Sequence, residues 1–142
     1  MGAKLAIGLT AGVLLLGTYY LEDAWEKGVE LPKEFTEGPE ALVWLKKNRG
    51  ESALASNRFG ETQNAARFVR QLYDAGALRV IVPEGSITKD DVETYADSLV
   101  VTLPTDPARR ERVWRICAEE ISRQGFDPEE SKNEKQVLLW WD

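Results

Sequence analysis

Residues 65–85 read AARFVRQLYDAGALRVIVPEG, and their periodicity changes from helix to strand at the glycine near the middle. Four apolar residues recur at the three- and four-residue spacing of an amphipathic helix: Ala65, Phe68, Val69 and Leu72. Gly76 is typical of the position just after a helix C-terminus. The β-branched run from Leu78 to Val82 then ends at the turn residues 83–85. This segment therefore predicts a helix followed by a strand.

Three further elements follow downstream. The β-branched run from Leu99 to Leu103 predicts a second strand that ends at Pro104. Residues 105–107 then place Asp106 as an N-cap before a proline at the first helical position. The helix that follows stops at Gly125 and carries the apolar stripe Val113, Trp114, Cys117 and Ile121. Residues 136–141 predict a last strand.

A weaker candidate strand, Ser52 to Phe59, precedes the first helix, and Leu54 is its strongest apolar residue. With this strand the order is β-α-β-β-α-β, which resembles the ferredoxin-like split βαβ arrangement of two helices on one face of a four-stranded antiparallel sheet. The resemblance lies in the order of elements and brings no functional residue with it. Without the first strand, a three-stranded α-β-β-α-β sheet remains. Either order predicts an α+β fold.

An almost uncharged apolar run from Leu5 to Leu21 lies before this domain. Its 17 residues would span roughly 25 Å as a helix, near the lower limit for crossing a bilayer. The A-x-A ending of a cleaved signal peptide is absent at 19–24, so we expect an uncleaved single-pass signal anchor. The alternatives are a cleaved signal and a buried or interfacial helix. The expected anchor residues are Lys4, Leu5, Leu14, Leu15, Leu16, Tyr19, Tyr20 and Trp25.

The charges beside this run suggest its orientation. Lys4 precedes it, whereas Glu22 and Asp23 follow at once. The positive-inside rule then places the N-terminus in the cytoplasm and the domain in the periplasm or outside the cell. Gly8 and Gly12 form a G-x-x-x-G, which can pair two membrane helices, although small residues are common in such segments.

Length and charge limit the rest of the chain. The 142 residues accommodate an anchor (1–24), a juxtamembrane linker with a short helix near Pro39–Lys47 (25–51) and one small α+β domain (52–142). The formal net charge is -6, and all 24 acidic residues follow the apolar run. Nucleic acid is therefore an unfavourable partner. We expect the lipid bilayer and a protein partner, or a second copy of the chain, as partners.

Residues for catalysis are scarce. The chain has no histidine, which excludes a Ser-His-Asp triad and histidine-ligated zinc within it. Its single cysteine, Cys117, is expected in the core, and we expect no cofactor and no metal. The acidic cluster 90–97 lacks the pattern of a calcium loop, and Thr88 with Asp91 suggests a helix cap instead. The arginines of 109–115 alternate with glutamates, as in solvated ion pairs.

The strand parities predict two apolar faces. One parity gives the core that the helices should cover: Leu78, Val80, Val82, Leu99, Val101, Leu103, Val137, Leu139 and Trp141. The other parity holds Ile81, Val100, Leu138 and Trp140, where a one-sided sheet should be polar. We expect this second face to be covered, by the Pro39–Lys47 helix or by another protein, and we favour the helix.

Three classes of function follow. The first is a membrane-anchored, non-catalytic interaction module on the exported side of a membrane. The second is a small domain that senses a ligand or peptide at its sheet. The third is a small enzyme that uses carboxylates such as Glu129 and Glu130, which so small a domain disfavours because it offers little concavity. We expect the first.

Overall fold

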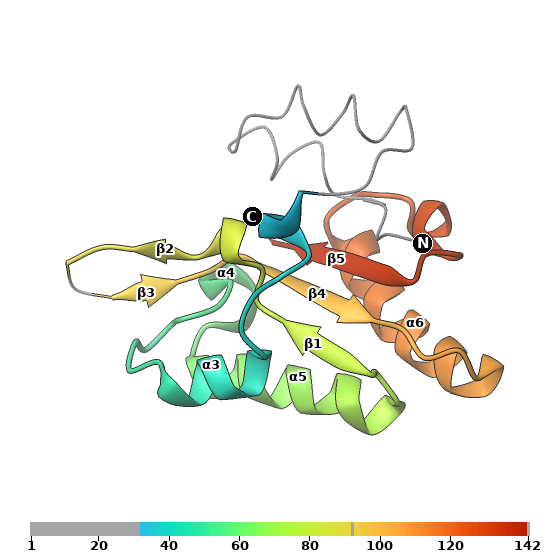
Figure 1. Ribbon diagram of the computed structural model, residues 1–142, viewed down its shortest axis with the longest axis horizontal. Coiled ribbons are helices and arrows are strands. Elements are labelled where there is room, and N and C mark those ends of the chain that lie inside the picture. Colours follow the sequence, from blue (N-terminus) through green and yellow to red (C-terminus); the bar gives the residue numbers. More distant parts are fainter. Residues whose placement is uncertain (1–31, 92, 142) are drawn as a thin grey trace.

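A three-stranded antiparallel sheet lies at the centre of the molecule (Figure 1). Its strands are β1 (Arg79–Ile81), β4 (Ser98–Thr102) and β5 (Gln136–Trp140), in the order β1-β4-β5. The computed structural model describes residues 32–91 and 93–141. The α+β class is confirmed, and the described sheet has the three strands of the shorter expected order.

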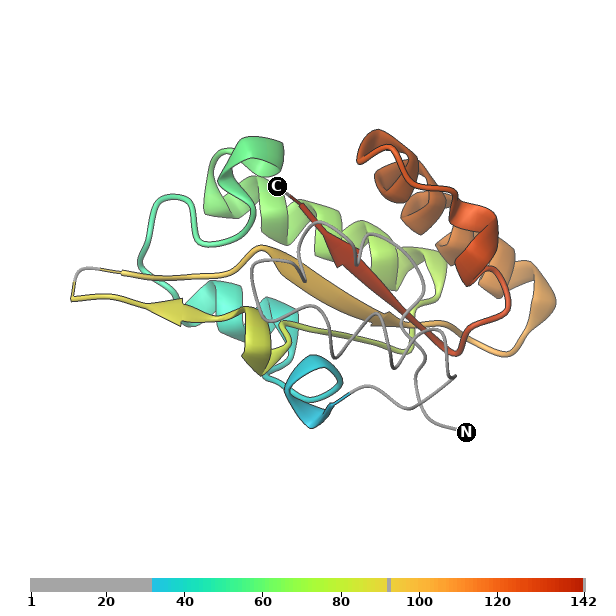
Figure 2. The same ribbon diagram turned by 90° about the horizontal axis from the view of Figure 1, so that it is seen from above.

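The main helices pack on one face of this sheet. They are α3 (Ala41–Lys47), α5 (Thr62–Ala75) and α6 (Pro107–Arg123), and all three contribute to one hydrophobic core with the strands. Seen from above, α5 passes behind β5, and α6 lies beside β5 (Figure 2). The side chain of Asp106 accepts a hydrogen bond from the Arg109 N–H at 3.0 Å, which confirms the expected cap of α6.

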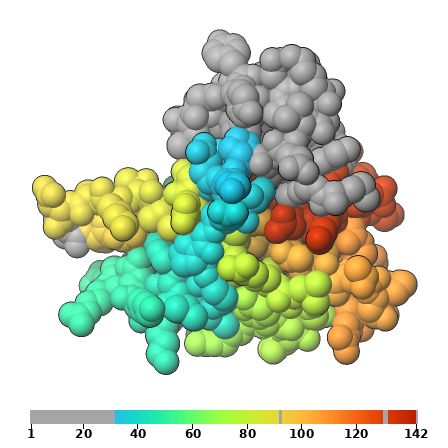
Figure 3. Space-filling model, in the orientation of Figure 1, coloured from blue at the N-terminus to red at the C-terminus, as the bar shows by residue number. Residues whose placement is uncertain are grey.

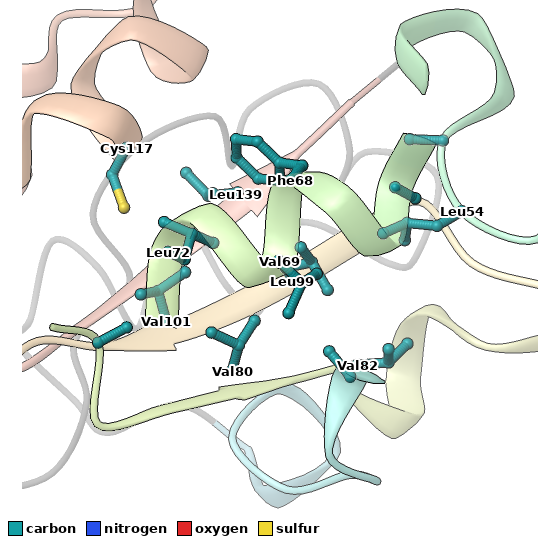
Figure 4. Close-up of a cluster of buried hydrophobic side chains, with 14 of the residues drawn as sticks. Leu54, Phe68, Val69, Leu72, Val80, Val82, Leu99, Val101, Cys117 and Leu139 are labelled. Atoms are coloured by element: carbon teal, nitrogen blue, oxygen red, sulfur yellow. The ribbon is translucent and has the colours of Figure 1, made fainter. Parts of the chain in front are cut away.

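The core consists of side chains from the expected face of the strands and from the apolar sides of the helices. In Figure 4, Phe68, Val69 and Leu72 of α5 lie over β4, the strand that carries Leu99 and Val101. Three aromatic rings, those of Phe59, Phe68 and Trp141, lie with centroids 5.1 to 5.9 Å apart at one end of this core. Leu78 was wrongly assigned to the core, because it precedes β1 and its side chain is 61% exposed.

The expected first strand at 52–59 does not form. Leu54 makes a single parallel bridge with Ala96, and Ala55 has a positive φ of 43° that turns the chain into the short helix α4 (Ser56–Phe59). Leu54 is nevertheless fully buried. The apolar residues of this segment thus reach the core from a turn. Their sequence pattern does not distinguish a buried turn from a buried strand.

The chain before α3 runs along the free side of β1. Glu40 bridges Ile81, and the Val82 N–H donates to the Pro39 carbonyl at 3.0 Å. A Cβ added to Gly38 would lie 1.9 Å from the Val82 carbonyl oxygen, so this close approach requires glycine. Since α3 follows directly and joins the core, part of the expected linker supplies structural residues of the domain.

Shorter elements complete the chain. Two 3-10 helices, η1 (Lys33–Phe35) and η2 (Glu84–Ser86), contact each other, and η3 (Pro128–Ser131) packs on α6. The strands β2 (Thr88–Lys89) and β3 (Thr94–Tyr95) form a hairpin that extends from the body (Figures 1 and 3). Thr88 therefore lies in a strand, and the helix cap expected between Thr88 and Asp91 is wrong. Thr88 and Asp91 have the three-residue spacing of a helix cap, but both residues belong to this polar hairpin.

Candidate interaction surface

The second face is the side of the sheet that carries Ile81, Val100, Leu138 and Trp140. The strand register pairs Ile81 with Val100 and Val100 with Leu138, so these three residues form a continuous row across the sheet. None of them belongs to the core that α3, α5 and α6 cover. The alternation of side chains along a strand explains this separation.

The residues of the second face are largely shielded. Ile81, Val100 and Leu138 are 3%, 2% and 7% exposed, and Trp140 is half-buried. The expected cover by the Pro39–Lys47 helix is wrong, because α3 packs against α5 and buries Ala41 and Leu45 in the core. Residues 37–40 run beside β1 and lead into α3 on the face of the sheet that α5 also covers. The 3-10 helix η1 lies on the opposite side of the sheet (Figure 1).

Trp140 is held in place by Asp97. The indole Nε1 donates to Asp97 Oδ2 at 3.3 Å, and the Ser98 hydroxyl donates to Asp97 Oδ1 at 2.8 Å. Beside Trp140 and Leu138, a hollow of about 10 Å³ borders Phe126. Such a volume holds about one water. The region near Trp140 is thus closely filled, and this hollow is too small for an organic ligand.

A larger and more open hollow lies beside α4 and α5. Its volume is about 260 Å³, and it is lined by Arg58, Phe59, Asn64, Arg67, Phe68 and Gln71. Arg58 is already paired, since its Nη2 lies 2.6 Å from Glu120 Oε1, and the Arg67 guanidinium donates to Asn64 Oδ1 at 3.2 Å. The hollow is therefore shallow and polar, and its two arginines already bond to other side chains of the protein.

Glu120 is a buried carboxylate that sequence reasoning missed. It is 3% exposed, and both its oxygens accept hydrogen bonds from Arg58 Nε at 2.8 and 3.1 Å. The signal was its spacing, because position 120 follows Val113 by seven residues and Cys117 by three on the apolar stripe of α6. The pair ties α4 to α6, and a buried carboxylate needs such a partner.

The cysteine has the core position expected of it. Cys117 has no exposed surface and lies on the buried side of α6 (Figure 4). Burial, followed by the negative charge of Glu120, raises the pKa of the Cys117 thiol to about 12. Because the thiolate is the reactive form, this cysteine is unsuited to nucleophilic chemistry at neutral pH.

The acidic residues of 90–97 and the arginines of 109–115 were the charged clusters noted in the sequence. Within the described residues, no group of three or more His, Cys, Asp or Glu side chains could hold a metal ion. Arg115 pairs with Glu111 at 3.1 Å along the exposed side of α6, whereas Arg110 donates to the carbonyls of Lys132 and Glu134 at 2.7 and 2.8 Å. The arginine-rich helix thereby fixes the segment that leads into β5.

The expected membrane residues lie outside the described part of the chain. These are the anchor positions Lys4, Leu5, Leu14, Leu15, Leu16, Tyr19, Tyr20 and Trp25, together with Gly8 and Gly12. Across residues 32–91 and 93–141, the helices are too short or too polar to cross a bilayer.

Comparison with known proteins gives no relative. No protein family, no curated protein and no solved structure matches the chain.

Proposed function

We propose that the chain is a membrane-anchored, non-catalytic interaction module whose domain acts on the exported side of a membrane. One structural observation carries the interaction role. The row Ile81–Val100–Leu138, with Trp140 beside it, makes the sheet apolar on the side away from α3, α5 and α6. Ile81, Val100 and Leu138 are themselves shielded, so the half-buried Trp140 is the residue of this face that a partner would contact.

The chemistry of the described side chains also favours contact over catalysis. The thiol of Cys117 is buried and protonated, and the buried carboxylate of Glu120 is neutralised by Arg58. The open hollow beside α5 uses its arginines for internal bonds. By contrast, Trp140 is a half-buried aromatic whose indole N–H donates to Asp97, and tryptophan is among the residues that contribute most to binding at protein interfaces.

The membrane part of the proposal rests on the apolar run 5–21 and the charges beside it. We expect the full-length protein to sediment with membranes and to resist extraction by carbonate. Protease added to intact spheroplasts should digest the domain, while a cytoplasmic marker stays intact. Release by carbonate, or full protection of the domain until the cells are lysed, would contradict the anchor or its orientation.

The interaction part is tested separately with detergent-solubilised full-length protein. Trp140→Ala should reduce capture of the partner that co-purifies with the wild type, because it removes the aromatic side chain of the second face. Leu78→Ala is the matched control, since Leu78 is an exposed apolar residue near the end of the same sheet. Equal capture by both variants would contradict a role for the second face.

A further inference from the structure

The second face is shielded, although the helices lie on the other side of the sheet. Val100, on the central strand β4, is 2% exposed, and its neighbour Ile81 on β1 is 3% exposed. Neither residue belongs to the core that α3, α5 and α6 cover. A side chain on an uncovered sheet face has its outer side in water. A layer of chain therefore lies over Ile81 and Val100 on this side of the sheet.

The described chain begins beside this face, at η1. The Phe35 N–H donates to the Pro32 carbonyl at 2.9 Å, so Pro32 opens η1, which lies on this side of the sheet (Figure 1). Phe35 is 5% exposed and, like Val100, lies outside the core that the helices cover. A Cβ added to Gly85 would lie 3.2 Å from Phe35 Cε1, so η1 packs closely on η2. The chain that precedes Pro32 therefore joins the domain at the second face.

The residues just before Pro32 have the pattern of an extended segment with one apolar side. Residues 25–31 read WEKGVEL, and Val29 and Leu31 are separated by Glu30. Side chains alternate between the two sides of an extended chain, so Val29 and Leu31 share one side while Glu30 takes the other. A residue that precedes proline is also restricted to extended backbone, which applies to Leu31.

We propose that residues 27–31 cross the second face as an extended segment, with Val29 and Leu31 packed against its apolar row. Glu30 then points into water. The occupant is part of the same chain and is attached to η1, which already lies on this side. A covalently attached segment has a high effective concentration at its site, so this cover forms without a second molecule.

The segment is long enough for this crossing. At about 3.3 Å per residue, the four steps from Leu31 back to Lys27 span roughly 13 Å. The distance from β1 across β4 to β5 is two strand spacings, or roughly 10 Å. Lys27, on the same side of the segment as Leu31, thus falls at the rim beyond β5. Its stem can pack there while its amine stays in water.

The consequence for the whole protein rests on the function proposed above. With an anchor at 1–24, residues 25 and 26 alone would separate the bilayer from the bound segment. The domain would then be held next to the membrane surface without a free tether. Trp140, half-buried at the β5 side of the second face, would remain for a partner.

Thiol labelling of the full-length, detergent-solubilised protein tests this cover. In a Cys117→Ala background, Val100→Cys places a single thiol at the centre of the second face. Val29→Ser with Leu31→Ser should raise the rate at which a maleimide labels this thiol by about ten-fold or more, because the segment loses both of its apolar contacts.

Two controls separate the cover from general unfolding. Glu26→Ser with Glu30→Ser changes the opposite side of the segment and should leave the labelling rate at position 100 unchanged. Val101→Cys provides a second probe, because Val101 follows Val100 on β4 but is 0% exposed within the core on the helical side. Its thiol should stay protected in every variant.

Three results would each overturn the proposal. The first is an equal labelling rate at position 100 in the two segment variants. The second is equal acceleration at positions 100 and 101, which would show that the segment acts on the whole fold. The third is a rate at position 100 that depends on protein concentration, which would identify a second copy as the cover. Failure here leaves the carbonate and protease tests of the anchor unaffected, because those tests do not involve the second face.

Discussion

At the residue scale, Cys117 shows how position determines chemistry in this domain. It belongs to the apolar stripe of α6, and its thiol has no exposed surface. With a pKa raised to about 12 by burial and by Glu120, the thiol stays protonated across the physiological range. Cys117 therefore contributes to the stability of the protein through its packing in the core.

Replacement of Cys117 tests this. Cys117→Ala should lower the free energy of unfolding by about 1 to 2 kcal/mol through lost packing, measured by urea denaturation. The wild-type thiol should react with a maleimide only after denaturant is added, and the rates with and without urea provide the comparison. Rapid labelling of the native protein would show that Cys117 is accessible and would contradict a core position.

At the scale of elements, the Tyr73 hydroxyl joins α5, β1 and α3. It donates to Glu40 Oε2 at 2.6 Å and accepts from the Val80 N–H at 3.0 Å. Burial by itself would raise the pKa of Glu40. The hydrogen bonds from Tyr73 and from the Val43 and Leu42 N–H groups outweigh burial and lower the pKa below 4.5. Burial and the bond to Glu40 raise the pKa of Tyr73 to about 12.

The stability of the wild type should therefore depend on pH through Glu40. A carboxyl whose pKa is lower when folded stabilises the folded state above its unfolded pKa, and this stabilisation is lost as pH falls from about 4.5 through the folded value. Tyr73→Phe should reduce stability by about 1 to 2 kcal/mol at neutral pH, because Val80 loses its partner, and should weaken the acid dependence. Urea titrations at pH 3 to 7 measure both effects. An unchanged acid slope would contradict the link.

The elements that sequence predicted well are those with a strong local pattern. Residues 65–75 and 107–121 carry helical spacing with recognisable ends. The two β-branched runs and residues 136–141 formed β1, β4 and β5. Residues 52–59 were misassigned because Leu54 is buried from a turn set by Ala55, which no periodicity records. The second face followed from strand parity. The face of the sheet on which α3 packs could not be predicted in this way. An amphipathic pattern shows that one side of a helix is buried, but it does not show which part of the protein buries it.

At the scale of the whole molecule, residues 32–50 are part of the folded unit. They close the β1 edge, and α3 buries Ala41 and Leu45 against α5. A fragment that begins at Glu51 would lose these contacts and leave the Val82 and Glu84 N–H groups without partners. Loss of one buried leucine side chain alone costs roughly 2 to 5 kcal/mol.

We therefore expect a fragment from Pro32 to unfold cooperatively on heating and a fragment from Glu51 to lose that transition. Typical domains have only about 5 to 15 kcal/mol of stability, which the lost contacts would largely remove. Thermal circular dichroism and tryptophan emission compare the two fragments. A Glu51 fragment that melts at the same temperature as the Pro32 fragment would show that α3 is dispensable.

The position of Trp141 has a consequence for folding during synthesis. Its ring is 2% exposed and lies against Phe59 and Phe68, and β5 pairs with β4 only through residues 136–140. The central ladder therefore cannot close until the ribosome has added these residues, roughly ten seconds after residue 32 at usual elongation rates. Residues 1–31 have left the exit tunnel by then. Any targeting signal among them can therefore act before β5 has joined the sheet and Trp141 has completed the core.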